Sequence, residues 1–168
     1  MAKTDSKPSL AAEIIALLSD SKQTIALAES CTGGLLSAAL TSVPGASVAV
    51  YGGFVTYSNA AKTRLIGVPP RLIRDYGAVS TQVARAMANG ARTTASTDVA
   101  VGITGIAGPD GGSNDKPVGL VHIAVATEHD TTVREFRFGP VGRDEVRTRS
   151  VEAALALLLE VLSLPVEI

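Results

Sequence analysis

Ser30 stands where an apolar, strand-like run, Thr24–Leu27, gives way to a helix that opens with glycines. A serine in such a turn presents its hydroxyl group at the end of a strand. Helix starts carry unpaired N–H groups, so the backbone around Gly33 and Gly34 can stabilise an anion that forms beside Ser30. Ser30 is therefore a candidate nucleophile. On position alone, the commoner role is that Ser30 or Thr32 caps the helix.

A serine nucleophile needs a base, and Lys62 is the better candidate. His122 lies inside an apolar strand-like run, which is typical of a core residue, and His129 lies at the tip of a predicted hairpin. Lys62 falls in the first turn of a helix that begins near Ser58. The positive end of the helix dipole and partial burial would lower the pKa of its amine there. A neutral Lys62 can accept the proton of Ser30, whereas the alternative is a solvated surface lysine.

Three segments are expected to meet at one edge of the sheet. Ligands of open α/β sheets bind beyond the carboxyl ends of the strands, where Ser30, the turn 57–59 and the turn 104–105 would lie together. Tyr57 is a candidate to orient the lysine or the substrate, or else a packing residue. Cys31 is a rival nucleophile, since helix starts lower thiol pKa values. Neighbours in a tight turn point in different directions, and we favour Ser30 as the residue that faces the pocket.

A long glycine-rich loop, 105–117, carries neither a P-loop nor a dinucleotide fingerprint, so neither ATP nor a dinucleotide is indicated. Its N–H groups are candidates to bind a phosphate or a carboxylate, and a plain flexible loop is the alternative. Arg143 and Arg147 are four residues apart and would share one helix face. They can hold one anionic group, unless they form surface ion pairs with Asp144 and Glu145.

Composition narrows the class of protein. The 168 residues are 46% hydrophobic, which fits a single domain over 1–168 with a flexible tail at 1–7. Fifteen basic and sixteen acidic residues leave a net charge of -1, so we expect neither nucleic acid nor a membrane as a partner. No apolar run approaches a membrane span, and the start lacks a signal-like apolar region. We expect a cytoplasmic protein, and the single cysteine and two histidines predict no disulfide and no metal site.

The order of helical and strand-like segments predicts an α/β fold. Helices are expected at 8–18, 35–40, 60–66, 80–91 and 143–162, with a short turn after Pro69; strands are expected at 24–27, 48–57, 98–104, 119–127 and 131–138. Helices separate the early strands, and a hairpin comes late. This order predicts a three-layer α/β/α sandwich whose mixed sheet is mostly parallel with one antiparallel strand.

Four motifs, in order, resemble the CinA C-terminal domain family. They are Ala28–Gly34, Tyr57–Lys62, Gly77–Ser80 and Thr104–Gly112, and the likeness runs from about Leu10 to Leu162. The family includes stand-alone nicotinamide-mononucleotide deamidases. The resemblance covers the deamidase-like unit of longer CinA proteins. It implies the same α/β/α fold, usually as a homodimer, and hydrolysis of the carboxamide of nicotinamide mononucleotide to nicotinate mononucleotide and ammonia without a metal or organic cofactor.

The resemblance also implies roles for single residues. Ser30 would be the nucleophile and Lys62 the general base, with Tyr57 and Thr104 orienting the lysine or the intermediate. The residues expected to contact the nucleotide substrate are Thr32, Gly33, Gly34, Asn59, Gly105, Gly108 and Arg143. The alternative function is a non-catalytic nucleotide-binding module, or a partner module related to competence or DNA damage.

Overall fold

The computed structural model describes residues 8–165, so the tail expected at 1–7 lies outside the described residues. The helices are α1 (Leu10–Asp20), α2 (Leu35–Thr41), α3 (Asn59–Ile66), α4 (Pro70–Tyr76), α5 (Thr81–Ala95) and α6 (Arg143–Leu162). The strands are β1 (Ile25–Glu29), β2 (Val50–Val55), β3 (Val99–Gly105), β4 (Leu120–Ala126) and β5 (Thr131–Arg137). The predicted α/β class is confirmed.

The sheet has five strands in the order β2-β1-β3-β4-β5. Strand β1 lies between β2 and β3 and runs parallel to both, whereas β4 runs antiparallel to β3 and to β5. Four strands therefore point the same way and β4 is reversed, which agrees with the predicted mixed sheet with one antiparallel strand. The carboxyl ends of β1, β2 and β3 lie together at one edge, with β1 in the middle.

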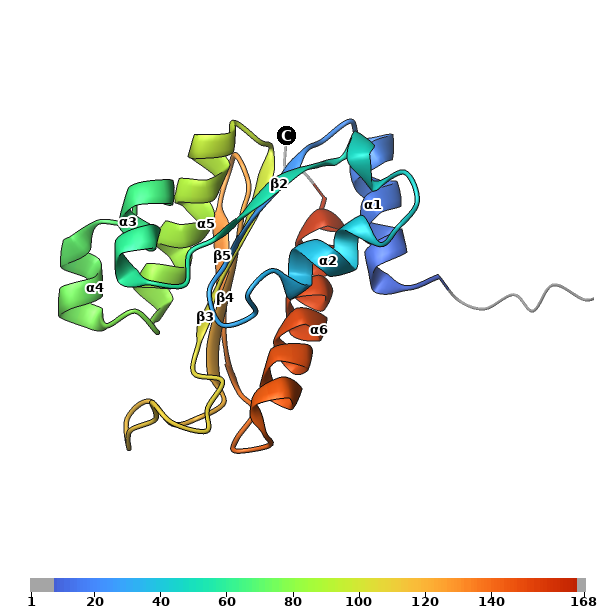
Figure 1. Cartoon of the computed structure of the whole chain (residues 1–168). Helices are drawn as coiled ribbons and strands as arrows, with labels where there is room; N and C mark the ends of the chain where they lie inside the picture. Colours follow the sequence, from blue (N-terminus) through green and yellow to red (C-terminus); the bar gives the residue numbers. More distant parts are fainter. Residues whose placement is uncertain (1–7, 166–168) are drawn as a thin grey trace, which may run out of the picture.

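Helices lie on both sides of this sheet: α1, α2 and α6 on one side and α3, α4 and α5 on the other (Figure 1). Side chains of β1 alternate between the two cores. Ile25 and Leu27 pack into the core under α1 and α6, while the small side chains of Ala26 and Ala28 face α3 and α5. Both faces of the strand are buried, as expected for a central strand of a covered sheet.

One α-helix and one short 3-10 helix, η1 (Ala46–Val48), were not expected from the sequence. Instead of a short turn after Pro69, the chain forms α4, with Pro70 in its first turn. Proline suits that position because its fixed φ is helical and its missing N–H group has no partner there in any helix. None of the helices within residues 8–165 is long and apolar enough to cross a membrane.

Helix α3 packs against α5 through a glycine. A Cβ atom added at Gly90 of α5 would lie 1.9 Å from the backbone oxygen of Ile66, the last residue of α3. No side chain fits in that space. The glycine therefore lets α5 approach the helix that carries Lys62.

We predict that Gly90→Ala lowers the free energy of unfolding by about 1–3 kcal/mol, because the helices must separate to admit the methyl group. Helix propensity alone predicts the opposite sign, since alanine is the better helix former. Chemical denaturation measures the difference, with Gly52→Ala as the control, because nothing lies within 4 Å of a Cβ added there. A Gly90→Ala protein as stable as Gly52→Ala would contradict the close contact.

Candidate active site

Ser30 and Lys62 meet in the structure. Ser30 directly follows β1, and its N–H group donates to the carbonyl oxygen of Ile103, which extends the pairing of β1 with β3. Lys62 lies on α3, and its Nζ atom is 3.0 Å from Ser30 Oγ. Both side chains are buried, with 8% of Ser30 and 1% of Lys62 exposed. Two residues that are 32 positions apart thus form one polar pair beneath the surface.

The amine of Lys62 is buried without a counter-charge. Nζ contacts the backbone oxygens of Thr56, at 2.9 Å, and Tyr57, at 3.3 Å. Among the ion pairs of the described residues, none includes Lys62. Burial lowers the pKa of Lys62, and the nearby Cys31 opposes this shift. The helix begins as predicted, with the Ser58 hydroxyl accepting a hydrogen bond from the third residue of α3.

This set of contacts suits a neutral amine. A neutral lysine has two N–H groups and one lone pair, whereas the ammonium form has three N–H groups and no lone pair. The carbonyl groups of Thr56 and Tyr57 can only accept hydrogen bonds, so they take both N–H groups of the neutral form. The lone pair then points to Ser30 and can accept its hydroxyl proton. The geometry is that of a nucleophile with its base.

The helix after Ser30 is capped by Glu29, a residue that the sequence analysis missed. Its carboxylate accepts hydrogen bonds from the N–H groups of Leu36, at 2.8 Å, and Ser37, at 2.9 Å, and from the Ser37 hydroxyl at 2.7 Å. The helix has Gly34 at its N-cap position, without a side-chain cap of its own. The signal in the sequence is an acidic residue at the end of an apolar strand, close to the positive start of a helix.

Because Glu29 caps α2, the Ser30 side chain is not needed as the helix cap. The alternative that Ser30 or Thr32 caps α2 is wrong, because the first N–H groups of the helix are taken by the carboxylate. The N–H group of Gly33 is also used, since it donates to the carbonyl oxygen of Ser30 at 3.0 Å and closes the turn. Within residues 8–165, the N–H groups of Cys31, Thr32 and Gly34 have no acceptor on another residue. These three are the amides next to Ser30 that remain for an anion.

Cys31 points away from the pair. Its side chain belongs to the apolar core on the α1 and α6 side of the sheet, whereas Lys62 reaches Ser30 from α3 on the other side. Burial raises the pKa of the Cys31 thiol to about 11, against a smaller lowering by its own backbone N–H group. The thiolate that a cysteine nucleophile needs is therefore scarce at neutral pH.

Tyr57 contacts Lys62 through its backbone rather than through its hydroxyl. Its side chain is 59% exposed, and its hydroxyl accepts a hydrogen bond from Arg143 Nη2 at 2.9 Å. Arg143 Nη1 also donates to the carbonyl oxygen of Gly108 at 2.8 Å. Tyr57 follows β2 and Gly108 follows β3, and these two strands lie on either side of β1. The guanidinium group of Arg143 therefore bridges the two segments that flank the end of Ser30's strand.

Arg147 holds the nucleophile turn itself. It donates to the backbone oxygens of Cys31, at 3.1 Å, and Thr32, at 3.3 Å. The ion pairs considered as an alternative for the two arginines do not involve them: Glu145 pairs with Arg149. Arg143 and Arg147 thus lie at the site on one face of α6.

Thr104 and Gly105 end β3 beside Ser30. The Thr104 hydroxyl is buried and donates to the carbonyl oxygen of Ala78 at 2.8 Å, so its remaining capacity is that of an acceptor. Gly105 has a packing role, since an added Cβ atom would meet Val121 at 2.7 Å and the sulfur of Cys31 at 3.1 Å. Thr104 lies beside Ser30 on the sheet, but its hydroxyl contacts Ala78 and neither Ser30 nor Lys62. Gly105 lets β3 approach β4 and Cys31 closely.

Asn59 lies apart from the pair. It lines a surface cavity of about 320 Å³ between α3 and α4, and neither Ser30 nor Lys62 lines that cavity. The remaining lining residues are Ala60, Thr63, Arg64, Pro70 and Ile73. The largely apolar cavity lies on a different face of α3 from the one that carries Lys62.

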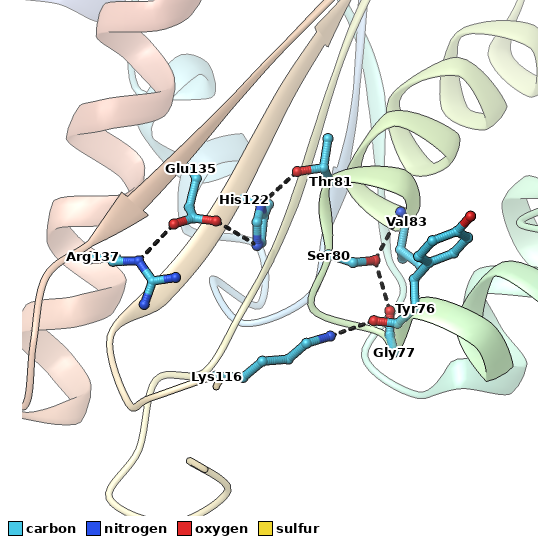
Figure 2. A network of polar contacts seen from close by, with 9 residues as sticks. All are labelled: Tyr76, Gly77, Ser80, Thr81, Val83, Lys116, His122, Glu135 and Arg137. Carbon is cyan, nitrogen blue, oxygen red and sulfur yellow. Dashed lines mark hydrogen bonds and ion pairs between the residues drawn. The ribbon is translucent and has the colours of Figure 1, made fainter. Parts of the chain in front are cut away.

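His122 belongs to a separate polar network (Figure 2). It lies on β4, with β3 between it and β1, and its Nδ1 atom is 3.3 Å from the Thr81 hydroxyl. Its Nε2 atom is 3.8 Å from a carboxylate oxygen of Glu135. Burial lowers the pKa of His122, and Glu135 opposes the shift. The ring has its partners on α5 and β5, not at Ser30.

The same view shows how the loop after β3 is attached to the α4–α5 connection (Figure 2). Lys116 donates to the carbonyl oxygen of Tyr76. Ser80 caps α5 by accepting from the N–H group of Val83, and its hydroxyl donates to Gly77. Within residues 8–165, no group of three or more His, Cys, Asp or Glu side chains is arranged to hold a metal ion.

Together, the fold and the site define an α/β domain with a buried serine–lysine pair at the carboxyl edge of its parallel strands. The family model described as the CinA C-terminal domain matches residues 7–162. The chain belongs to the CinA C-terminal domain family.

Relatives and solved structures agree with this assignment. The chain is 54% identical over 132 residues to a CinA-like protein of Geobacter sulfurreducens, and 56% identical over 133 residues to one of Acidobacterium capsulatum. These matches cover 79% of this chain but 32% and 31% of the relatives, so the chain spans about a third of their length. The crystal structure of the competence/damage inducible protein CihA from Agrobacterium tumefaciens is 42% identical, with a TM-score of 0.89 over 96% of this chain and 100% of that one. A CinA superfamily protein from Escherichia coli is 34% identical, with a TM-score of 0.88 over 96% of this chain and 93% of the other.

We predict that Cys31 reacts slowly with a thiol reagent in the folded protein. At pH 8 a thiol with a pKa of about 11 has roughly 100-fold less thiolate than one at 9.0, the ordinary value, and burial restricts access further. A colorimetric thiol assay on native and urea-unfolded protein measures the ratio. Equal rates in the two states would contradict the buried position.

Proposed function

We propose that this chain is an amidohydrolase that deamidates nicotinamide mononucleotide through an acyl-enzyme on Ser30. The observation that carries the proposal is the buried contact between Lys62 Nζ and Ser30 Oγ at 3.0 Å, with no counter-charge for the amine. A lysine held neutral in this way is a known type of base for a serine nucleophile. Membership of the CinA C-terminal domain family is consistent with this chemistry.

In the first half of the reaction, Lys62 takes the proton of Ser30 while Ser30 Oγ forms a bond to the carboxamide carbon. The electron pair of the C=O double bond moves to oxygen, and the N–H groups of this turn that lack an acceptor, those of Cys31, Thr32 and Gly34, are the candidates to stabilise that oxyanion. The Lys62 ammonium group then gives its proton to the amide nitrogen. The oxyanion re-forms the C=O double bond as the C–N bond breaks with its electron pair on nitrogen, so ammonia leaves and the acyl group stays on Ser30 Oγ.

In the second half, the same base activates water. Neutral Lys62 accepts a proton from a water molecule while the hydroxide adds to the ester carbon. The bond from carbon to Ser30 Oγ breaks, and Ser30 recovers the proton from Lys62. The products are the carboxylic acid and the original state of the pair, so no cofactor is consumed.

The proposed substrate also needs a partner for its phosphate group. Arg143 and Arg147 lie on one face of α6 and reach the segments around Ser30. Neither has a carboxylate partner among the ion pairs of the described residues. Arginine is well suited to phosphate because its planar guanidinium group donates two parallel hydrogen bonds. The choice of nicotinamide mononucleotide itself rests on the motifs that resemble the stand-alone deamidases.

The expected homodimer stays a prediction. Tyr51 and Val55, on the edge strand β2, and the nearby Val48 expose large apolar side chains. An exposed apolar edge strand is a common surface for pairing with another chain. A second copy of this chain is the partner that we propose for it.

We predict that Ser30→Ala and Lys62→Met each reduce ammonia release from nicotinamide mononucleotide at least about a thousandfold, because each removes one member of the nucleophile–base pair. Lys62→Arg should be equally inactive, since a guanidinium group stays protonated and cannot act as a base. A coupled ammonia assay measures turnover. Ser42→Ala, an exposed serine at the other end of α2, is the control that should keep it.

Near wild-type turnover in Ser30→Ala or Lys62→Met would refute the proposed mechanism. Calorimetry with nicotinamide mononucleotide separates the alternative function. Binding by the wild-type protein without ammonia release would identify a nucleotide-binding module. Nicotinamide in place of the nucleotide shows whether the phosphate-bearing part is required.

The pH dependence follows from the lowered pKa of Lys62. The pair is active when the amine is neutral, so kcat/KM should rise with pH through the pKa of Lys62 and level off above it. Because burial lowers that pKa below its ordinary value of 10.5, the midpoint of the rise should lie below pH 10.5. A pH–rate profile measures the midpoint. A rate that rises only near pH 10.5 would show that the amine is solvated.

A further inference from the structure

Thr56 buries a hydroxyl group that has no hydrogen-bond partner. Its side chain is 0% exposed, and within residues 8–165 only Thr32 and Thr56 have buried side-chain atoms of this kind. An unpaired buried hydroxyl lowers stability, and natural structures contain few of them. Removal of the hydroxyl by an isosteric valine would relieve that cost. A reason other than stability is therefore needed for the threonine.

The sheet places this hydroxyl beside the nucleophile. In the parallel pairing of β1 with β2, Ala28 lies opposite Phe54, and the N–H group of Thr56 donates to the oxygen of Glu29 at 2.8 Å. The ladder thus continues by one residue, to Ser30 and Thr56. Side chains alternate along a strand, so both lie on the face of Ala28 and Phe54, which is covered by α3 and α5. Lys62 enters from the same side.

The backbone of Thr56 already holds the amine. Its carbonyl oxygen is 2.9 Å from Lys62 Nζ, whereas its hydroxyl has no hydrogen-bond partner in the resting state. The residue that carries the free hydroxyl is therefore already in contact with the amine. Before reaction, Ser30 Oγ and the carbonyl oxygens of Thr56 and Tyr57 are the three groups around Nζ. In the resting state the two carbonyl oxygens accept the N–H groups of the neutral amine, and the Ser30 hydroxyl faces its lone pair.

Proton transfer changes the number of hydrogen bonds that Lys62 must donate. Once Ser30 has given its proton to Lys62 and formed its bond to carbon, the ammonium group has three N–H groups to place. Two go to the carbonyl oxygens of Thr56 and Tyr57, while Ser30 Oγ is now the weakly accepting oxygen of a tetrahedral or ester group. The third N–H group needs another acceptor, because the amine is buried and an unpaired N–H group of a buried charge is costly.

We propose that the Thr56 hydroxyl is a positioning group that accepts this third hydrogen bond and stabilises the Lys62 ammonium group formed during catalysis. The inference rests on the proposed function, because it takes the Ser30–Lys62 pair as nucleophile and base. In this role, the hydroxyl is left unpaired in the resting state because it is used in the charged intermediate. Stability is given up for rate, as is common at active sites.

The test compares Thr56→Val with Thr56→Ser and Thr97→Val. Thr97 is a matched control, because it is also a buried threonine but its hydroxyl has a partner, the carbonyl oxygen of Val99 at 2.9 Å. It lies before the start of β3, whereas Ser30 lies beside the other end of that strand. We expect Thr56→Val to keep or raise the denaturation midpoint while kcat for ammonia release falls at least about tenfold, the value of one hydrogen bond to a charged group. Thr56→Ser should restore kcat to within a few-fold. Thr97→Val should show the reverse pattern, a lower midpoint with unchanged kcat.

A second measurement does not depend on turnover. In Ser30→Ala, Lys62 has lost one acceptor, which imitates the spent serine, and the Thr56 hydroxyl should replace it. Adding Thr56→Val to Ser30→Ala should then lower the pKa of Lys62 by roughly one unit, followed by NMR of isotopically labelled lysine. Within the described residues, Cys31 is the titratable group whose charge bears on Lys62, and its pKa of about 11 keeps the thiol uncharged over most of the titration.

Two results would overturn the proposal. One is a Thr56→Val protein with unchanged kcat and unchanged Lys62 pKa in the Ser30→Ala background. The other is a loss of kcat that comes with a lower midpoint and no rescue by serine, which would indicate a structural role. If the wild-type protein releases no ammonia, the proposed function fails on its own, and the pKa of Lys62 in the double variant alone decides the role of Thr56.

Discussion

The burial of an amine without a counter-charge is the constraint on which this structure depends. A carboxylate beside Lys62 would have stabilised the ammonium form and removed the base. Instead the chain surrounds Nζ with backbone oxygens and one hydroxyl, which satisfy its hydrogen bonds without supplying charge. Holding these groups in place needs α3 close to the sheet, and the contact between Gly90 and Ile66 fixes α3 against α5.

The turn after β1 determines which of two neighbouring candidate nucleophiles, Ser30 or Cys31, faces Lys62. The carboxylate of Glu29 ties β1 to α2, and Arg147 holds the oxygens of Cys31 and Thr32. With the turn fixed at both ends, Cys31 is directed into the core and Ser30 toward α3. The carboxylate also disfavours a thiolate at Cys31. The same few contacts therefore select serine and suppress cysteine.

Most helices and strands could be predicted from the sequence, because the spacing of apolar residues differs between helices and strands. Helical and strand-like periodicity predicted the element order except α4, whose short segment after two prolines is too brief for its pattern to be distinct. The proximity of Ser30 and Lys62 could be predicted because Ser30 follows a predicted strand and Lys62 lies in the first turn of a predicted helix. Backbone groups were not: the carbonyl oxygens of Thr56 and Tyr57 act at the site regardless of side-chain type. The type of a residue does not show which group its backbone carbonyl oxygen contacts.

A row of polar side chains, one from each strand or from the residue that follows it, runs across the sheet at the level of Ser30. Thr104 lies opposite His122 and His122 opposite Glu135, and extending the parallel ladders by one residue places Ser30 between Thr56 and Thr104. All five face the helices α3 and α5. What differs along this row is the covering element: α3 brings a lysine over the end of β1, whereas α5 brings the Thr81 hydroxyl to His122. The strands thus supply hydroxyl and imidazole groups at several positions, and the helix above each strand end decides where a base meets a nucleophile.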